Sequence, residues 1–107
     1  MVRGPRAPPF PLKPALFTPA AEDDVEGAFQ WYESQRPGLG VAFRHALDIA
    51  VAALESNPEA YAVIHRNTRR VLLPKFPYGL YYRLADETIV VVACLHAKRH
   101  PRIWRSR

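Results

Sequence analysis

The sequence contains one cysteine, Cys94, and no long apolar run. A single cysteine cannot form a disulfide within the chain, so a reduced, cytoplasmic setting is the simpler expectation. No apolar stretch approaches the roughly 20 residues that a membrane-spanning helix needs. The first residues carry positive charge without an apolar segment behind them, which predicts no secretory signal. We therefore expect no association with a membrane.

Motifs for metal or phosphate chemistry are also missing. His, Cys and Asp do not recur at metal-ligand spacing, and the sequence has no glycine-rich phosphate loop. His45 and His65 are isolated, which is typical of surface or core positions. We expect neither a metal nor another cofactor.

Acidic residues are scarce in the second half of the chain. Residues 60–107 hold ten Lys or Arg against only Asp86 and Glu87, a net charge of +8, whereas residues 1–59 have a net charge of −3. This asymmetry favours an anionic partner for the second half, either nucleic acid or an acidic protein segment. A solvated basic surface is the alternative interpretation, and the two have about equal weight.

The chain has 107 residues, of which 49% are hydrophobic, and this suits one small globular domain. Four of the eleven prolines lie in residues 1–12, which predicts an extended and poorly ordered stretch. The domain should therefore comprise residues 13–107.

The first part of this domain predicts a strand followed by two helices. Residues 14–18 suit a short strand. Thr18 and Pro19 suit the cap and first position of a helix that ends at the Pro37-Gly38 joint. Apolar residues recur at helical spacing through residues 39–56, and an Asn-Pro pair ends this second helix. The short joint predicts an antiparallel helix hairpin.

The second part changes to a strand-like period. Residues 70–73 and 78–84 predict two strands, and residues 85–87 predict a turn. The apolar run TIVVVACL, residues 88–95, suits a central strand that is buried on both faces. The order β-α-α-β-β-β predicts an α+β domain, with a small, mainly antiparallel sheet covered on one face by the helix hairpin.

The aromatic residues allow two interpretations. Tyr82 favours cross-strand packing, whereas Tyr81 suits either packing or stacking on a nucleic-acid base. Trp31 and Tyr32 should pack within the helix hairpin. Trp104 suits closure of the core.

Four stretches carry a resemblance to a known family. They are WYESQRPGLG at residues 31–40, SNPEAY at 56–61, RRVLLPKFPYGLYYRL at 69–84 and LHAKRHPRIW at 95–104. In this order and spacing they resemble the RelE/ParE toxin superfamily of type II toxin–antitoxin systems, and most of all its ParE-like plasmid-stabilisation branch. The resemblance implies the predicted fold and an antitoxin partner, usually encoded by an adjacent gene, whose C-terminal segment wraps and neutralises the toxin. We expect that segment to be acidic.

The resemblance also implies one of two toxic activities. ParE-like members block DNA gyrase and are not known as hydrolases. RelE-like members cut messenger RNA in the ribosomal decoding site, which needs a base for the 2′-OH, charge stabilisation of the phosphorane and an acid for the leaving oxygen. An inactive relic that only binds the antitoxin is a third possibility.

RelE-like members place the cleavage chemistry on two lysines, two arginines and a tyrosine. The first lysine falls at Arg70, which keeps the charge but is a poor base. The second lysine falls at Leu72 and the first arginine at or near Gly79, so both functions are lost. The second arginine is kept as Arg99. The tyrosine falls near Trp104, which stacks on a base but is no acid. These residues favour gyrase binding without hydrolysis.

A substitute catalytic set consists of His96, Arg99 and Arg70, with histidine as acid or base and arginine on phosphate. His96 is somewhat better explained as a polar residue that ends a buried strand. The basic tail that begins at His96 is the predicted surface for target, nucleic acid or antitoxin. The residues predicted to bind there or nearby are Lys75, Arg83, Lys98, Arg99, Arg102 and Trp104.

Overall fold

A computed structural model describes residues 14–99 and 101–107, so the predicted extension 1–12 lies outside the described residues. The elements follow one another as β1 (Ala15–Phe17), α1 (Pro19–Gln35), α2 (Leu39–Ser56), β2 (Val63–His65), β3 (Thr68–Leu72), β4 (Tyr78–Ala85), β5 (Thr88–His96) and α3 (Pro101–Arg105).

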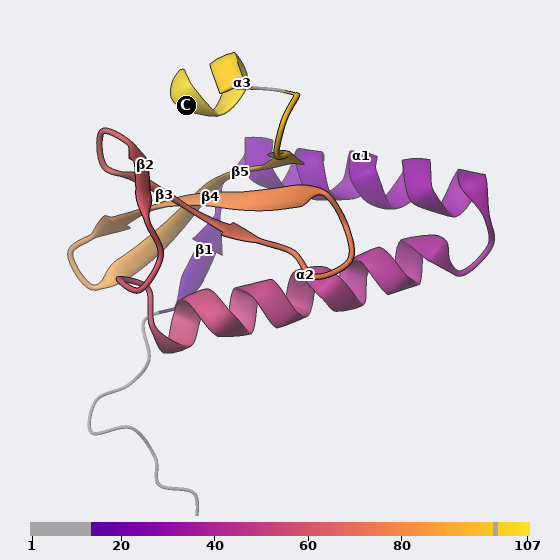
Figure 1. Cartoon of the computed structure of the whole chain (residues 1–107), viewed down its shortest axis with the longest axis horizontal. Coiled ribbons are helices and arrows are strands. Elements are labelled where there is room, and N and C mark those ends of the chain that lie inside the picture. The colour runs from indigo at the N-terminus through magenta and orange to yellow at the C-terminus, as the bar shows by residue number, and fades with distance from the viewer. Residues whose placement is uncertain (1–13, 100) are drawn as a thin grey trace, which may run out of the picture.

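The strands form one five-stranded sheet in the order β1-β5-β4-β3-β2. β1 pairs with β5 in parallel, and the other neighbours are antiparallel. Figure 1 shows the α1–α2 hairpin along one side of the sheet and α3 on the other side. The α+β class, the helix hairpin and the central position of β5 are thereby confirmed.

Local sequence explains the start of both helices. The Oγ1 atom of Thr18 accepts a hydrogen bond from the Ala21 N–H at 3.1 Å, and Pro19 occupies the first turn of α1. Gly38 adopts a positive φ of 91° at the joint and has no side chain to cap α2. Glu33 supplies that cap, because its carboxylate accepts from the N–H groups of Gly38 and Gly40 at 3.0 and 2.9 Å.

The main core lies between the helix hairpin and the sheet. Its fully buried members include Phe43 and Leu54 on α2 and Leu80 and Tyr82 on β4, which confirms the packing role of Tyr82. The Tyr82 hydroxyl donates to the Pro58 carbonyl at 2.7 Å, so burying the phenol leaves no unpaired polar group.

One prediction about this core was only half right. Tyr32 packs on Phe43 and Phe76, with ring centroids 5.3 and 4.9 Å apart. Trp31 is 56% exposed, and its ring meets that of Tyr32 edge to face with centroids 5.0 Å apart. Successive side chains along a helix point about 100° apart, so Trp31 points away from the helix face on which Tyr32 is buried.

Two elements of the structure were missed by the sequence analysis. β2 has three residues and forms an irregular edge pairing with β3, which itself begins at Thr68 rather than at residue 70. α3 has five residues. Segments this short carry too few repeats for a hydrophobic period to be recognised. Within residues 14–99 and 101–107, no helix is long and apolar enough to cross a membrane.

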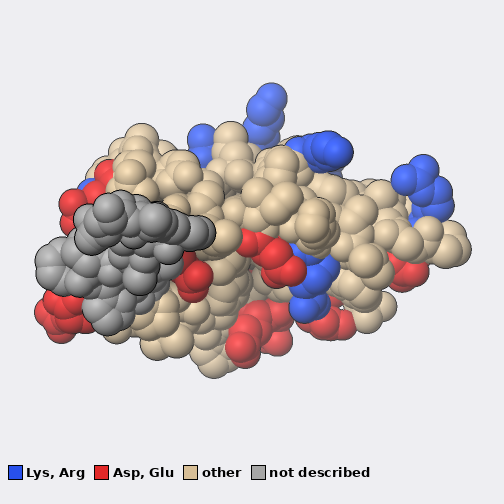
Figure 2. Space-filling view, turned by 90° about the horizontal axis from the view of Figure 1, so that it is seen from below, with Lys and Arg blue, Asp and Glu red and all other residues tan. Residues whose placement is uncertain are grey.

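Charge is unevenly distributed over the surface that is seen from the α2 side. Figure 2 looks onto the structure from the α2 side, and acidic side chains spread across the lower part of that surface while basic ones lie mainly along the upper margin. Most of the acidic residues belong to the first half of the chain, which forms the helices. The predicted charge asymmetry therefore becomes a spatial one.

Candidate functional site

The tail after β5 folds back over the sheet face that the helix hairpin leaves open. It turns at His96, whose carbonyl accepts from the Arg99 N–H at 3.2 Å and whose Nδ1 accepts from the Lys98 N–H at 3.2 Å. The Ala97 N–H donates to the Pro77 carbonyl at 2.8 Å, so the turn is anchored to the loop before β4. α3 then covers the far side of the sheet.

A second, smaller core forms beneath α3. Trp104 is only 6% exposed, and its ring stacks on Tyr81 with centroids 5.0 Å apart and planes inclined by 14°. His65 meets the same tryptophan edge to face at 5.8 Å, and Val92 and Ala93 complete the cluster. This placement agrees with the expected closure of the core by Trp104, whose role in binding stays a prediction. It assigns Tyr81 to packing, since the two rings stack on each other.

A β-bulge in β5 contains the backbone carbonyl to which the Arg107 side chain binds. Tyr81 pairs with Ala93 and Tyr82 with Val91, so Val92 is the extra residue between them. β1 ends at Phe17 and does not extend along this part of β5.

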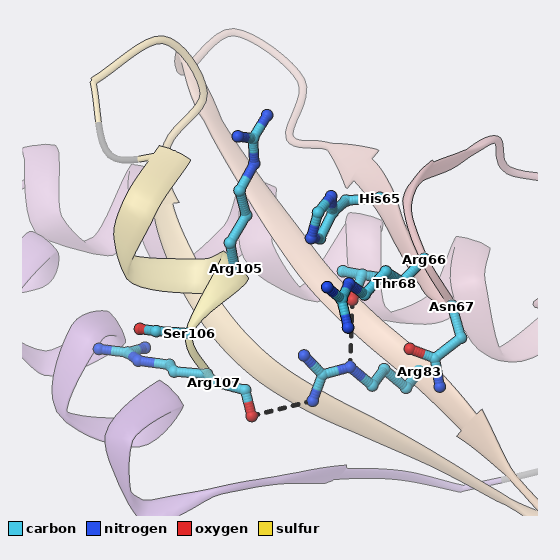
Figure 3. Close-up of a pocket in the computed structure, with 8 residues that line it drawn as sticks. All are labelled: His65, Arg66, Asn67, Thr68, Arg83, Arg105, Ser106 and Arg107. Carbon is cyan, nitrogen blue, oxygen red and sulfur yellow. Dashed lines mark hydrogen bonds between the residues drawn. The ribbon is translucent and has the colours of Figure 1, made fainter.

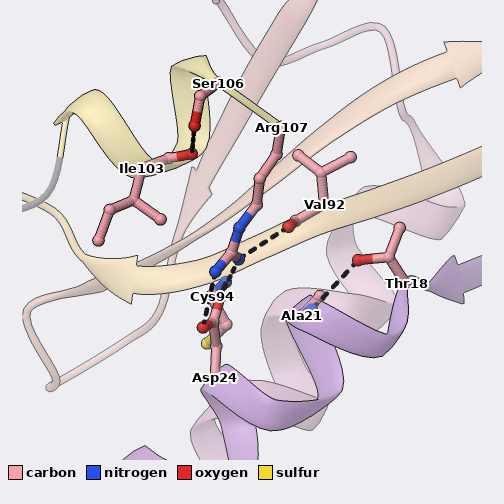
Figure 4. Close-up of polar contacts among 8 residues, drawn as sticks. All are labelled: Thr18, Ala21, Asp24, Val92, Cys94, Ile103, Ser106 and Arg107. Carbon is pink, nitrogen blue, oxygen red and sulfur yellow. Dashed lines mark hydrogen bonds and ion pairs between the residues drawn. The ribbon is translucent and has the colours of Figure 1, made fainter.

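Two charged side chains form hydrogen bonds with backbone groups of β5 beyond the part that pairs with β1. The Arg107 guanidinium donates to the Val92 carbonyl at 3.0 Å, and an Asp24 carboxylate oxygen accepts from the Cys94 N–H at 3.0 Å. Arg107 and Asp24 also form an ion pair with each other, as Figure 4 shows. The pair joins the first turns of α1, the bulge in β5 and the segment that follows α3.

A cleft of about 640 Å³ lies between α1 and β5. His96 and Arg99 both line it, together with Tyr32, Tyr78 and Asp24. The His96 ring is 5.8 Å from that of Tyr78, its register partner on β4. The structure therefore brings two of the three predicted catalytic residues to one cleft.

Burial controls the ionisation of this cleft. It raises the pKa of Tyr32 and Tyr78 above the ordinary value, while the nearby Arg99 lowers both. It also raises the pKa of the Cys94 thiol to about 12, and Asp24 adds to the effect. The phenols and the thiol therefore stay protonated at neutral pH, so none of them supplies a ready nucleophile or base.

Arg70, the third predicted catalytic residue, lies on the opposite face of the sheet. It pairs with Tyr81 in register, and its side chain runs across Gly79, where a Cβ atom would come within 3.0 Å of it. His96 pairs with Tyr78, whose side chain packs on the helix side. The two faces keep Arg70 apart from His96 and Arg99.

Three of the five ribonuclease positions implied by the resemblance, Arg70, Leu72 and Gly79, meet on one face of the sheet. Leu72 is 53% exposed there, and its side chain lies near Gly79 as well as near Arg70. This part of the sheet therefore presents one guanidinium, one aliphatic side chain and a bare backbone. It holds no group that donates or accepts a proton near neutral pH, so these three residues supply no acid–base pair.

The other predicted binding residues differ in their surroundings. Lys75, Lys98 and Arg102 are exposed, and Lys75 adopts a positive φ of 67° in the connection between β3 and β4. Arg83 is half-buried, and its guanidinium donates to Thr68 Oγ1 at 3.1 Å and to the Arg107 backbone oxygen at 3.0 Å. Arg83 thus orders the chain end as well as carrying charge.

Asp24 and Arg107 were not predicted from the sequence to be partners. No local signal relates them, because they are 83 residues apart. Within the described residues, no three His, Cys, Asp or Glu side chains are placed to hold a metal ion.

The helix hairpin on a mainly antiparallel sheet is the α+β arrangement that the resemblance implied. A sequence model described as the ParE toxin of the type II toxin–antitoxin system, parDE, matches residues 15–101. The chain therefore belongs to the ParE toxin family.

Individual relatives agree with this assignment. The chain is 28% identical over 81 residues to proteins called Toxin ParE2 from two strains of Mycobacterium tuberculosis, CDC 1551 / Oshkosh and ATCC 25618 / H37Rv, covering 75% of this chain and 77% of theirs. A solved structure described as the chromosomal ParDE TA system from P. aeruginosa superposes with a TM-score of 0.72 at 14% identity, covering 81% of this chain and 98% of that one. The structural likeness shows the fold.

Proposed function

We propose that this protein is a cytoplasmic growth inhibitor that binds DNA gyrase without hydrolysing a substrate, and that a cognate antitoxin neutralises it. The observation that carries the proposal is the state of the ribonuclease positions in a member of the ParE family. Leu72 and Gly79 replace two of the polar groups, and Trp104 is packed against Tyr81. Without an acid–base pair, RNA cleavage lacks the proton transfers it needs, and this favours action by binding to a target.

Exposed cations of the tail supply the surface for the target. Lys98, Arg99 and Arg102 are all exposed, and they flank the turn between β5 and α3. The described structure pairs none of the three side chains with a carboxylate, since its one ion pair joins Arg107 to Asp24. Replacing all three by Gln should therefore weaken target binding while leaving both cores intact.

The decisive assay measures supercoiling by purified gyrase with increasing amounts of the full chain. The proposal predicts loss of supercoiling, intact messenger RNA in the same cells, and restored supercoiling with the triple Gln variant. Relaxation by topoisomerase I should be unaffected, which controls for non-specific DNA binding. Normal supercoiling at a large excess of protein would contradict the proposal.

The antitoxin should bind through an acidic segment that covers the basic side of the sheet and the cleft beside α1. A net charge of +8 in residues 60–107 would speed and orient such an encounter. Co-expression with a short acidic protein from the adjacent gene should restore growth. Association that is equally fast in low and high salt would argue against charge-guided binding.

An mRNA endonuclease is the second candidate, because His96 and Arg99 line the same cleft. It predicts discrete cleavage sites in cellular mRNA after toxin expression. Unchanged cleavage in a variant with His96→Ala and Arg99→Ala would exclude these residues as its site. A chain that causes no growth defect when expressed without antitoxin would instead be an inactive relic.

A further inference from the structure

A second pocket, of about 530 Å³, shares no lining residue with the α1–β5 cleft. Its lining comes from the β2–β3 hairpin at residues 65–68, from Arg83 on β4, and from residues 105–107. Figure 3 shows Arg83 between the hairpin residues on one side and Arg107 on the other. Neither the proposed gyrase contact nor the α1–β5 cleft involves this pocket.

Arg83 is held in a fixed orientation in the pocket. Its Nε donates to Thr68 Oγ1 at 3.1 Å, and one Nη donates to the Arg107 backbone oxygen at 3.0 Å. Thr68 is only 1% exposed, so this acceptor is itself rigidly placed. A guanidinium carries five N–H donors in a planar fork, and the two bonds leave the others for a ligand. A preorganised donor set of this kind loses little side-chain entropy on binding.

Basic side chains gather around Arg83. Arg66, Arg105 and His65 line the same pocket, and none of its described lining residues is Asp or Glu. The Arg105 guanidinium lies 5.3 Å from the centroid of the Trp104 ring. The Arg107 guanidinium is engaged by Asp24 on the other side, so three arginines remain for an anion.

The backbone at Arg66 carries strain. Its φ of 52° lies in the left-handed region, which a long side chain occupies at an energetic cost. Arg66 is the first residue of the turn between β2 and β3, and Asn67, a residue that tolerates positive φ better, follows it. The strained position thus carries a cation that faces a basic pocket.

The geometry points to a phosphate-binding site, with Arg83 at its centre and Arg66, Arg105 and His65 around it. The planar N–H donors of a guanidinium match the spacing of phosphate oxygens. A phosphate has enough charge and enough acceptor oxygens to bind several arginines at once. A single carboxylate has fewer acceptor oxygens and would leave some of these arginines without a partner. The pocket volume falls in the range of small-molecule sites. The phosphate reaches it either as a free ligand, such as pyrophosphate or a nucleotide, or as part of a nucleic-acid backbone.

Trp104 offers a direct readout of binding. His65 and Arg105 both contact its ring, so a ligand that engages them should change its fluorescence. The chain has two tryptophans, and Trp31→Phe leaves Trp104 as the single emitter. The full chain with Trp31→Phe is titrated with pyrophosphate, ATP and an oligothymidine of about 12 nucleotides, a length typical of single-strand sites.

Arg66→Asn combined with Arg105→Gln should raise the Kd for the phosphate ligand at least about tenfold, which corresponds to about 1.4 kcal/mol. Arg36→Gln serves as the matched control, because Arg36 is exposed at the α1–α2 joint outside the pocket. Arg66→Asn should not lower the midpoint of thermal unfolding, since Asn relieves the positive φ. This separates loss of binding from loss of folding.

Each outcome of the titration has one meaning. Saturation by pyrophosphate or ATP identifies a free phosphate ligand, and saturation by the oligonucleotide alone identifies a nucleic-acid backbone; both support the site. Three results would overturn it: no saturable response to any of the probes, an unchanged Kd in the double variant, or hexaglutamate binding as tightly as pyrophosphate. All of them are independent of whether gyrase is inhibited.

Discussion

Asp24 on α1 and Arg107 beyond α3 form an ion pair across 83 residues of sequence. Each partner also satisfies a backbone group of β5, because Asp24 accepts from the Cys94 N–H and Arg107 donates to the Val92 carbonyl. Both groups belong to the part of β5 that β1 does not cover. The two side chains therefore supply hydrogen bonds to the edge of β5 that a longer β1 would have supplied from its backbone.

Breaking this pair should destabilise the fold. Asp24→Asn removes the counter-charge of Arg107, and Arg107→Gln removes that of Asp24. The Asp24 side chain is 12% exposed and the Arg107 side chain 25%, so water solvates the remaining charge only in part. We expect a loss of about 2–3 kcal/mol for either variant in urea unfolding. The double variant should cost clearly less than the sum of the two, and strict additivity would show that the two residues do not interact.

Gly27 on α1 and Gly40 on α2 differ in the space that an added Cβ atom would have. A Cβ at Gly40 would lie 2.9 Å from the Phe29 carbonyl oxygen on α1, whereas a Cβ at Gly27 meets no described atom within 4 Å. Gly40→Ala should cost about 1–3 kcal/mol because the helices must separate. Gly27→Ala should stabilise by about 0.5–1 kcal/mol through helix propensity. Thermal unfolding measures both, and equal signs would contradict the helix contact.

The burial of Trp104 in the second core predicts that removing its ring will strongly destabilise the fold. Trp104→Ala removes a ring that is 6% exposed and stacked on Tyr81, so we expect a loss of about 3–5 kcal/mol. Trp104→Phe keeps an aromatic partner for Tyr81 and should cost less. Urea unfolding followed by near-UV circular dichroism measures the change. A neutral Trp104→Ala would mean that α3 does not pack on the sheet in solution.

Burial of Tyr82 predicts alkaline instability. Its pKa rises from an ordinary 10.0 to about 12 in the folded state, chiefly because burial disfavours the phenolate. The folded state therefore holds its proton more tightly, and this stabilisation is complete below pH 10 and lost as the pH rises toward 12. Stability should fall by about 1.4 kcal/mol per pH unit from this residue within that window.

Tyr82→Phe tests the assignment. The variant loses the hydrogen bond to Pro58, so it should be about 1 kcal/mol less stable at neutral pH. It should also show a flatter decline between pH 10 and 12, because its side chain does not titrate. The free energy of urea unfolding measured across this range gives both values. An unchanged slope would assign the alkaline loss to other groups, such as the Cys94 thiol.

Several elements were readable from local residue patterns. Thr18 and Pro19 marked the start of α1, the apolar run of β5 marked a central strand, and the changes of period marked the β-α-α-β order. These features depend on neighbours within one or two turns, which a linear sequence displays. β2 was missed because three residues show no period.

The sequence by itself determined the fold class, the Thr18 cap of α1, the apolar strand β5 and the division of charge along the chain, since each arises from adjacent residues or from composition. Only the tertiary structure decided which side chains share a site. It placed His96 with Arg99, moved Arg70 to the opposite face, and joined Asp24 to Arg107. The side of β4 or β5 to which a residue points depends on strand register and on the bulge at Val92, and a shift of one position reverses every face.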